Sequence, residues 1–184
     1  MKNKYENLKE TVVHLVNKSI LPTGTGLITP ETPFTNKEHF VNVFNLSKKY
    51  IYWIDKYFTK MGLNLLLESI DPKRVKTIRI LTSIDKVDEK IKENFKDFKK
   101  ELKYKNVSCD LRVITDNKIK SSIHDRWIIT DGYCYNVPST DTLARGQYSE
   151  IKPTLNRLPF KDWWEKSKDI SKDWDEISSK TKVS

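Results

Sequence analysis

The chain has 184 residues, the size of one domain with a hydrophobic core. Its 34 lysine and arginine residues outnumber 25 aspartate and glutamate residues, which gives a net charge of +9. This excess favours a polyanionic partner, either nucleic acid or an acidic membrane surface, although lysine-rich surfaces also serve solubility alone. No apolar run reaches the roughly 18–20 residues that span a bilayer, so any membrane contact would be peripheral.

The amino-terminal residues lack the apolar core of a signal peptide. The two cysteines, Cys109 and Cys134, have the spacing of neither a CxxC motif nor a zinc site. These observations predict a cytoplasmic protein with reduced thiols.

Residues 1–34 predict a helix followed by an irregular arm. Four apolar residues recur at helical spacing: Tyr5, Leu8, Val12 and Leu15. The stretch "LPTGTGLITPETPF" then supplies the proline and glycine residues of an irregular segment. Thr35 followed by Glu38 fits a capping box, which predicts that the next helix opens there.

Helices and strands alternate over residues 35–151, which we expect to form the main domain. Apolar runs predict strands at 49–58, 74–84, 107–115, 123–132 and 133–137, and helical periodicity predicts helices at 61–70 and 86–105. On the second of these helices one face is apolar, with Val87, Ile91, Phe95, Phe98 and Leu102. Alternating helices and strands followed by successive strands predict an α/β sandwich with a mixed β-sheet flanked by helices.

Residues 152–184 predict a polar, helical carboxyl-terminal tail. Trp163 and Trp174 lie eleven residues apart, a spacing of three helical turns. These tryptophans, with Trp164, are expected to pack a closing helix against the domain, with a partner contact as the alternative.

The stretch "IHDRWIITDG" carries the most informative chemistry. If it is a strand, His124 and Arg126 project from one face, and Asp131 follows at its end. An imidazole with a pKa near neutrality and a fixed cation suit phosphoryl transfer, and a carboxylate could orient the ring or fix the strand. Alternatively, His124 is a half-buried histidine bonded to Asp125 or Asp131, and Arg126 belongs to a structural ion pair.

The spacing His124-x-Arg126-x-x-x-x-Asp131 resembles the HxKx4D signature of the phospholipase D superfamily. In that family a glycine, a serine, any residue and an asparagine follow the aspartate after six residues, and a glutamate comes shortly afterwards. Ser139 and Glu150 match the serine and the glutamate. The stretch "YIYWIDKYF" is similar to the family's "IVDPYF". The resemblance covers residues 35–150 and implies a phospholipase D-like fold with a single motif.

The pattern departs from the family at three positions. Arg126 replaces lysine, and its guanidinium can hold a phosphate bidentately but cannot give up a proton. Asp141 replaces asparagine and adds a negative charge, and Pro138 replaces glycine. The stretch also resembles the "HDR" variant in the carboxyl-terminal domain of MIT-domain proteins and in bacterial conflict-system proteins. This likeness implies host defence as a setting, and binding without cleavage as an alternative to catalysis.

The resemblance implies a phosphodiesterase, and specifically a metal-independent nuclease without cofactors. His124 would attack phosphorus to form a phosphohistidine, Arg126 and Ser139 would hold the phosphate, and Glu150 would orient the ring of the partner histidine. The protonating histidine would come from a homodimer that pairs two copies of His124. His14 and His39, on predicted helices, are expected to be ordinary helix residues.

The alternative is a catalytically degenerate module that binds nucleic acid, phospholipid or a partner protein, as part of a larger complex or alone. Lys118 and Lys120 precede the motif and would add salt-sensitive affinity for a polyanion, or would simply be solvated.

Overall fold

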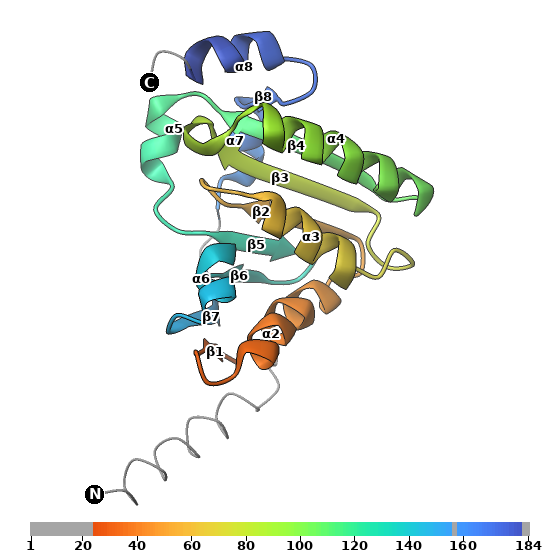
Figure 1. Cartoon of the computed structure of the whole chain (residues 1–184), viewed down its shortest axis with the longest axis vertical. Helices are drawn as coiled ribbons and strands as arrows, with labels where there is room; N and C mark the ends of the chain where they lie inside the picture. Colours follow the sequence, from red (N-terminus) through yellow and green to blue (C-terminus); the bar gives the residue numbers. More distant parts are fainter. Residues whose placement is uncertain (1–23, 156–157, 182–184) are drawn as a thin grey trace, which may run out of the picture.

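An eight-stranded sheet forms the centre of the computed structural model, which describes residues 24–155 and 158–181 (Figure 1). Its strand order is β1-β7-β6-β5-β2-β3-β4-β8. The strands are β1 (Gly26–Ile28), β2 (Tyr50–Ile54), β3 (Thr77–Ser83), β4 (Ser108–Ile114), β5 (Trp127–Thr130), β6 (Cys134–Asn136), β7 (Ser149–Pro153) and β8 (Lys168–Asp169). The helices are α2 (Pro33–Asn45), α3 (Lys60–Ser69), the 3-10 helix η1 (Ile84–Lys86), α4 (Glu89–Tyr104), α5 (Asn117–Ser122), α6 (Thr140–Arg145), α7 (Phe160–Glu165) and α8 (Trp174–Thr181).

The sheet is mixed. β2, β3 and β4 are parallel, and the other paired strands are antiparallel. Because β5 is antiparallel to β2 and β3 is parallel to it, the start of β5 lies at the same end of the strands as the ends of β2 and β3. We call this end of the strands the carboxyl edge. The opposite edge, where β2, β3 and β4 begin, is the amino edge. The expected α/β architecture, a mixed sheet flanked by helices, is confirmed.

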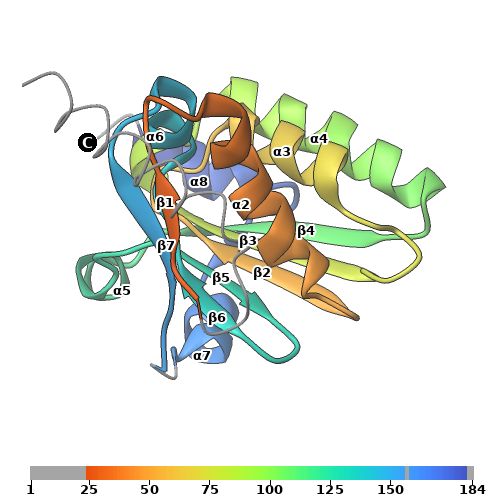
Figure 2. The same ribbon diagram turned by 90° about the horizontal axis from the view of Figure 1, so that it is seen from below.

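The two faces of the sheet are covered differently. Figure 2 shows α2, α3 and α4 on one side, which we call the first face, and α7 on the other, the second face. Phe40 and Phe44 of α2 pack against Trp53 of β2, with ring centroids 5.9 and 5.7 Å from the indole. Four residues of the predicted apolar face lie on α4 and are buried here, Ile91, Phe95, Phe98 and Leu102, whereas Val87 is buried just before the helix begins. A separate apolar cluster covers the carboxyl half of the second face: Ile54, Leu81, Ile114, Ile119, Ile123, Trp127, Phe160, Trp163 and Trp164.

Several element boundaries differ from the sequence prediction. α2 begins at Pro33, with Thr32 at its N-cap, so the capping box at Thr35 and Glu38 was wrong. Proline is favoured in the first turn because its missing N–H would have no helical partner there. Trp163 and Trp174 belong to two helices, α7 and α8, with β8 between them, so one helix through both was also wrong.

Segments on both sides of residues 35–151 contribute strands to the sheet. β1 pairs with β7, and β8 pairs with β4. The predicted amino-terminal helix, with its apolar residues from Tyr5 to Leu15, lies outside the described residues.

Candidate functional site

The carboxyl edge brings a buried aspartate against the arginine of the sequence motif. The register of the two antiparallel strands places Ile54 opposite Trp127. Asp55, the residue after β2, therefore meets Arg126, the residue before β5. The Nε of Arg126 donates a hydrogen bond to Oδ1 of Asp55 over 3.0 Å, and the Tyr57 N–H donates to the same oxygen over 2.9 Å.

The ion pair is buried at one end and open at the other. The side chain of Asp55 is 1% exposed, whereas that of Arg126 is 28% exposed. Burial raises the pKa of Asp55, and Arg126 and the Tyr57 N–H offset only part of this effect. The guanidinium carbon of Arg126 lies 5.8 Å from the centre of the Tyr57 ring. The two terminal nitrogens of Arg126 have no hydrogen-bond partner within residues 24–155 and 158–181, so they can bind an anion.

His124 lies in the loop between α5 and β5. The strand begins only at Trp127, so the interpretation that His124 and Arg126 share a strand face was wrong. Ile123, fully buried in the second apolar cluster, anchors the chain just before the loop, and this leaves His124 and Asp125 exposed. No hydrogen bond joins the His124 ring to another described residue, so the bonded-histidine alternative is not what the structure shows.

Asp131 lies at the opposite end of β5 from His124. Its carboxylate accepts hydrogen bonds from the backbone N–H of Lys48, over 2.7 and 2.9 Å, and of Lys49, over 3.0 Å, and contacts Ser47 Oγ at 3.3 Å. Burial by itself would raise the pKa of Asp131, but these N–H groups lower it. In the structure the carboxylate fixes the turn that leads into β2, and the catalytic role expected of Asp131 stays a prediction.

Ser139 and its neighbours do lie at the carboxyl edge. Ser139 caps α6, since its Oγ accepts a hydrogen bond from the Thr142 N–H over 3.0 Å. The Oγ1 of the next residue, Thr140, lies 3.3 Å from Oγ1 of Thr59, which follows β2. The negative charge of Asp141 reaches Asp55 and raises its pKa. A bound phosphate would therefore face the charge of Asp141 as well as that of Arg126.

Other residues of the motif have partners of their own. Glu150 in β7 ion-pairs with Lys152 over 2.6 Å. Glu150 raises the pKa of Lys152, and the charge of Asp125 adds to this effect. Lys120 in α5 ion-pairs with Asp85 over 2.9 Å, whereas Lys118 is exposed.

Among the described residues, no second histidine completes a two-histidine site with His124. His39 is buried in α2 among core residues, and neither ring nitrogen makes a hydrogen bond of good geometry. Burial lowers the pKa of His39, and the Leu27 backbone offsets only part of that effect. His14 lies outside the described residues.

Sequence reasoning missed Asp55, Tyr57 and Thr59 as site residues. The available signal was a lone carboxylate directly after the buried run "YIYWI", at the end of a strand. In open α/β sheets ligands bind outside the carboxyl ends of the strands, so such a residue points to a site.

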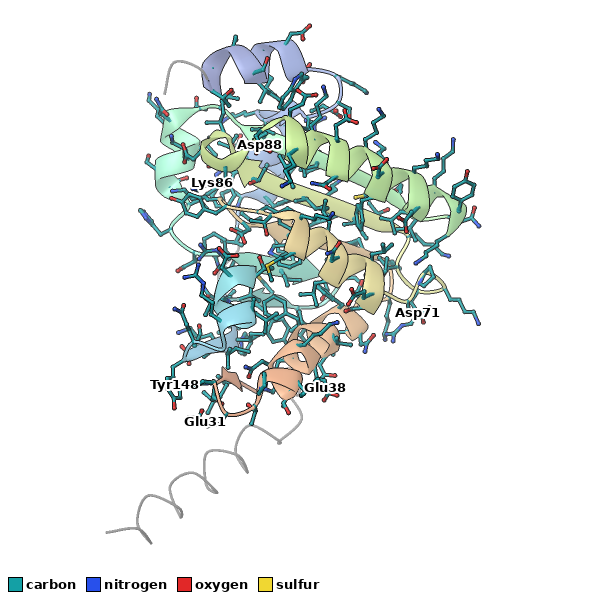
Figure 3. All side chains as sticks on the ribbon, in the orientation of Figure 1. Glu31, Glu38, Asp71, Lys86, Asp88 and Tyr148 are labelled. Atoms are coloured by element: carbon teal, nitrogen blue, oxygen red, sulfur yellow. The ribbon has the colours of Figure 1, made fainter. Side chains whose placement is uncertain are left out.

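Two hollows flank this edge. One, of about 170 Å³, lies where α3 and α4 begin and is lined by Phe58, Thr59, Lys60, Lys86, Asp88, Lys90, Ile91 and Asn94. Figure 3 labels Lys86 and Asp88 at the carboxyl edge and Asp71 towards the amino edge. Three lysines against one aspartate make this hollow basic.

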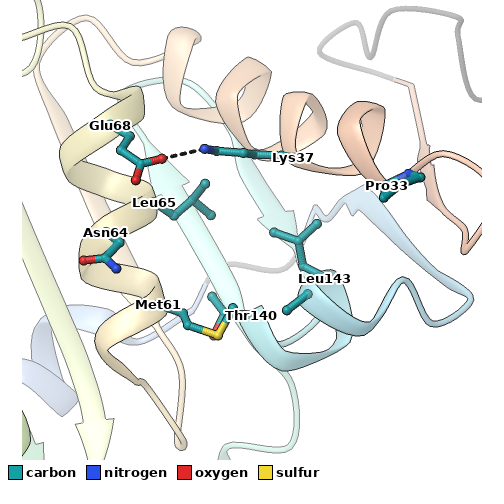
Figure 4. Close-up of a pocket in the computed structure, with 9 residues that line it drawn as sticks. Pro33, Lys37, Met61, Asn64, Leu65, Glu68, Thr140 and Leu143 are labelled. Carbon is teal, nitrogen blue, oxygen red and sulfur yellow. Dashed lines mark hydrogen bonds and ion pairs between the residues drawn. The ribbon is translucent and has the colours of Figure 1, made fainter.

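The second hollow is an apolar groove of about 290 Å³ between α2, α3 and α6 (Figure 4). Met61, Leu65 and Leu143 line it, and the Lys37–Glu68 ion pair crosses one end. The two charged residues of its lining, Lys37 and Glu68, are paired with each other.

Within residues 24–155 and 158–181, no group of three or more histidine, cysteine, aspartate or glutamate side chains is placed to hold a metal ion. No helix in these ranges has the length and apolar character needed to cross a membrane.

No protein-family model matches the chain, and no curated protein matches it. Among solved structures, the chain is similar to TrmBL2, described as an archaeal chromatin protein with a novel mode of DNA binding. The match covers 91% of this chain and 61% of that chain, with a TM-score of 0.48 and 15% sequence identity.

Proposed function

We propose that this chain is a phospholipase D-like module that binds the phosphodiester groups of nucleic acid at its carboxyl edge. The observation that carries the proposal is the Asp55–Arg126 pair. Asp55 takes only the Nε of Arg126, so the guanidinium is held in one orientation with its terminal nitrogens free. A guanidinium fixed in this way matches the geometry of two phosphate oxygens.

The surroundings of Arg126 support an anionic ligand. The exposed ring of His124 lies in the same loop, and the basic hollow with Lys60, Lys86 and Lys90 adjoins Thr59. The net charge of +9 favours a polyanion over a small monoanion. The resemblance of the motif to the phospholipase D superfamily supports a phosphodiester.

Binding without cleavage is favoured for a single chain. Asp131 caps a turn at the far end of β5, Glu150 is paired with Lys152, and no second imidazole adjoins His124 among the described residues. The charge of Asp141 opposes a dianionic transition state more strongly than a monoanionic phosphodiester.

A second candidate is a nuclease that is active only as a homodimer. It is favoured by the exposure of His124, since a twofold axis beside this loop would bring two imidazoles together. One His124 would form a bond to phosphorus as the bond to the leaving oxygen breaks. The other would protonate that oxygen, and water would then hydrolyse the phosphohistidine.

Fluorescence anisotropy with labelled single- and double-stranded DNA and RNA tests the first candidate. Arg126→Gln should weaken binding by about 10-fold or more, since a hydrogen bond to a charged group contributes about 1.5–3 kcal/mol. The slope of the logarithm of the affinity against the logarithm of the salt concentration should become shallower by about one. Lys105→Gln, which removes an exposed charge after α4, is the matched control. A folded Arg126→Gln protein that binds as tightly as the wild type would refute the proposal, as would binding only to phosphatidylserine vesicles.

The same samples test the second candidate. Cleavage that persists in EDTA, disappears in His124→Ala and accompanies a dimeric mass in solution would establish the nuclease. An uncleaved substrate bound by a monomer would eliminate it.

A further inference from the structure

The amino half of the second face of the sheet is polar and only partly buried. Alternate residues of β2, β3 and β4 point to this face, and towards the carboxyl edge they include Ile54, Leu81 and Ile114 of the second apolar cluster. Towards the amino edge they are Tyr50, Thr77, Arg79, Ser108 and Asp110, all partly or fully exposed.

A stack of four aromatic rings runs along this face. Tyr50 stacks on Tyr52 with centroids 4.4 Å apart, and Tyr52 stacks on Phe160 at 4.6 Å. Phe160 stacks on Trp164 at 5.6 Å, which ties the inner end of the stack to α7. Among the described residues no further ring or cation lies over Tyr50. The stack therefore ends in a partly exposed phenol ring that is held in place from one side.

Cations border this stack. The guanidinium of Arg79 lies 5.3 Å from the Tyr52 ring centre and 5.2 Å from that of Trp164. No carboxylate in the described part of the chain forms an ion pair with Arg79. Lys49 and Lys76, which precede Tyr50 and Thr77 in the chain, are exposed at the amino edge, and Nζ of Lys76 donates a hydrogen bond to the Pro72 carbonyl over 2.9 Å.

The nearby carboxylates are already engaged. Asp110 is paired with Lys99 over 2.8 Å. Asp131 accepts hydrogen bonds from the backbone N–H groups of Lys48 and Lys49 and keeps its negative charge, which is one charge against those of Lys48, Lys49, Lys76 and Arg79. The charge left over at this end of the face is positive, which complements a nucleic-acid backbone.

We propose that the second face binds single-stranded nucleic acid, with an unpaired base stacked on Tyr50 and the backbone held by the cations around it. A ring fixed in a stack loses little freedom when a base adds to it, and every base offers a π face, so the binding tolerates different sequences. A duplex cannot use this surface because its bases are already stacked and paired. The inference rests on the proposed nucleic-acid binding. It adds that the bound nucleic acid is single-stranded and that a second surface of the protein contacts it.

Tyr50 and Asp55 lie at opposite ends of β2, roughly 17 Å apart at 3.3 Å per residue. An oligonucleotide within the site size of roughly 4–16 nucleotides of other single-strand-binding folds can reach from one surface to the other. The base contact and the phosphate contact can therefore be removed separately.

The test compares a labelled oligonucleotide of about 12 thymidines with an abasic backbone of the same length, which keeps the phosphates and lacks the bases. The proteins are the wild type, Tyr50→Leu, Tyr50→Phe and the control Tyr104→Leu, whose ring on α4 is 80% exposed. Tyr50→Leu should weaken binding of the thymidine strand between about fivefold and 150-fold, with binding of the abasic strand unchanged. Tyr50→Phe, which keeps the ring, should bind as the wild type does, and circular dichroism confirms that each variant is folded.

Equal affinity of the wild type for the two strands would overturn the inference. So would an equal loss in Tyr104→Leu, or a folded Tyr50→Leu protein with undiminished affinity. The proposed carboxyl-edge site fails separately, when Arg126→Gln leaves abasic-strand binding intact while Tyr50→Leu still loses thymidine-strand binding. Absence of binding to either strand would overturn both.

Discussion

Replacing Asp131 by alanine should destabilise the fold and leave phosphodiester binding unchanged. The carboxylate accepts hydrogen bonds from two backbone N–H groups, those of Lys48 and Lys49. Each is a partly solvated bond worth about 0.5–1 kcal/mol, so the variant should lose about 1–2 kcal/mol of unfolding free energy. For a chain of this size each kcal/mol lowers Tm by about 2–4 °C, which gives an expected decrease of about 2–8 °C.

Thermal unfolding followed by circular dichroism measures the stability, and anisotropy with the abasic oligonucleotide measures the binding. His124→Ala is the matched variant with the opposite expectation, because its ring is exposed and makes no hydrogen bond to another described residue. Its free energy of unfolding should change by no more than about 0.5 kcal/mol, the small effect expected of a surface substitution. Its affinity should fall.

The stabilisation by Asp131 should also depend on pH. Because its pKa is lowered in the folded chain, the contribution is present above the pKa of the unfolded aspartate, near 3.9, and is lost as the pH falls through the folded pKa. An Asp131→Ala protein with unchanged Tm and lost binding would refute the structural role and assign Asp131 to the anion-binding site.

Two further predictions concern the helices around the site. Burial lowers the pKa of His39, so the unfolded chain binds a proton below about pH 6.5 that the folded chain resists. The free energy of unfolding should therefore fall as the pH falls below that value, by up to about 1.4 kcal/mol per pH unit in urea titrations. His39→Leu should lack this pH dependence, and His124→Gln should retain it. Gly146 ends α6 at φ 58°, and a Cβ there would lie 3.1 Å from Pro30 Cα, so Gly146→Ala should cost about 1–2 kcal/mol in denaturant unfolding. A stability equal to that of the wild type would contradict this left-handed cap.

The sequence predicted the central elements because their apolar patterns report burial directly. Strands near β2, β3 and β4 and helices near α3 and α4 follow from runs of apolar residues and from helical spacing. Boundaries were less well predicted, because the capping residue of α2 and the start of β5 depend on contacts with other elements. The motif itself was visible from spacing alone, but spacing does not show which residues are neighbours in space.

By itself the sequence determined the α/β class, the order of the central elements and the presence of an imidazole and a guanidinium close together in the chain. Tertiary structure alone decided that Arg126 meets the buried carboxylate of Asp55, because this contact depends on the antiparallel register of two strands separated by more than seventy residues. The same register carries Asp131 to the far end of β5, away from His124, since four extended residues separate the two ends of that strand. Periodicity fixes which side chains are buried, whereas only strand pairing fixes which of the polar ones meet.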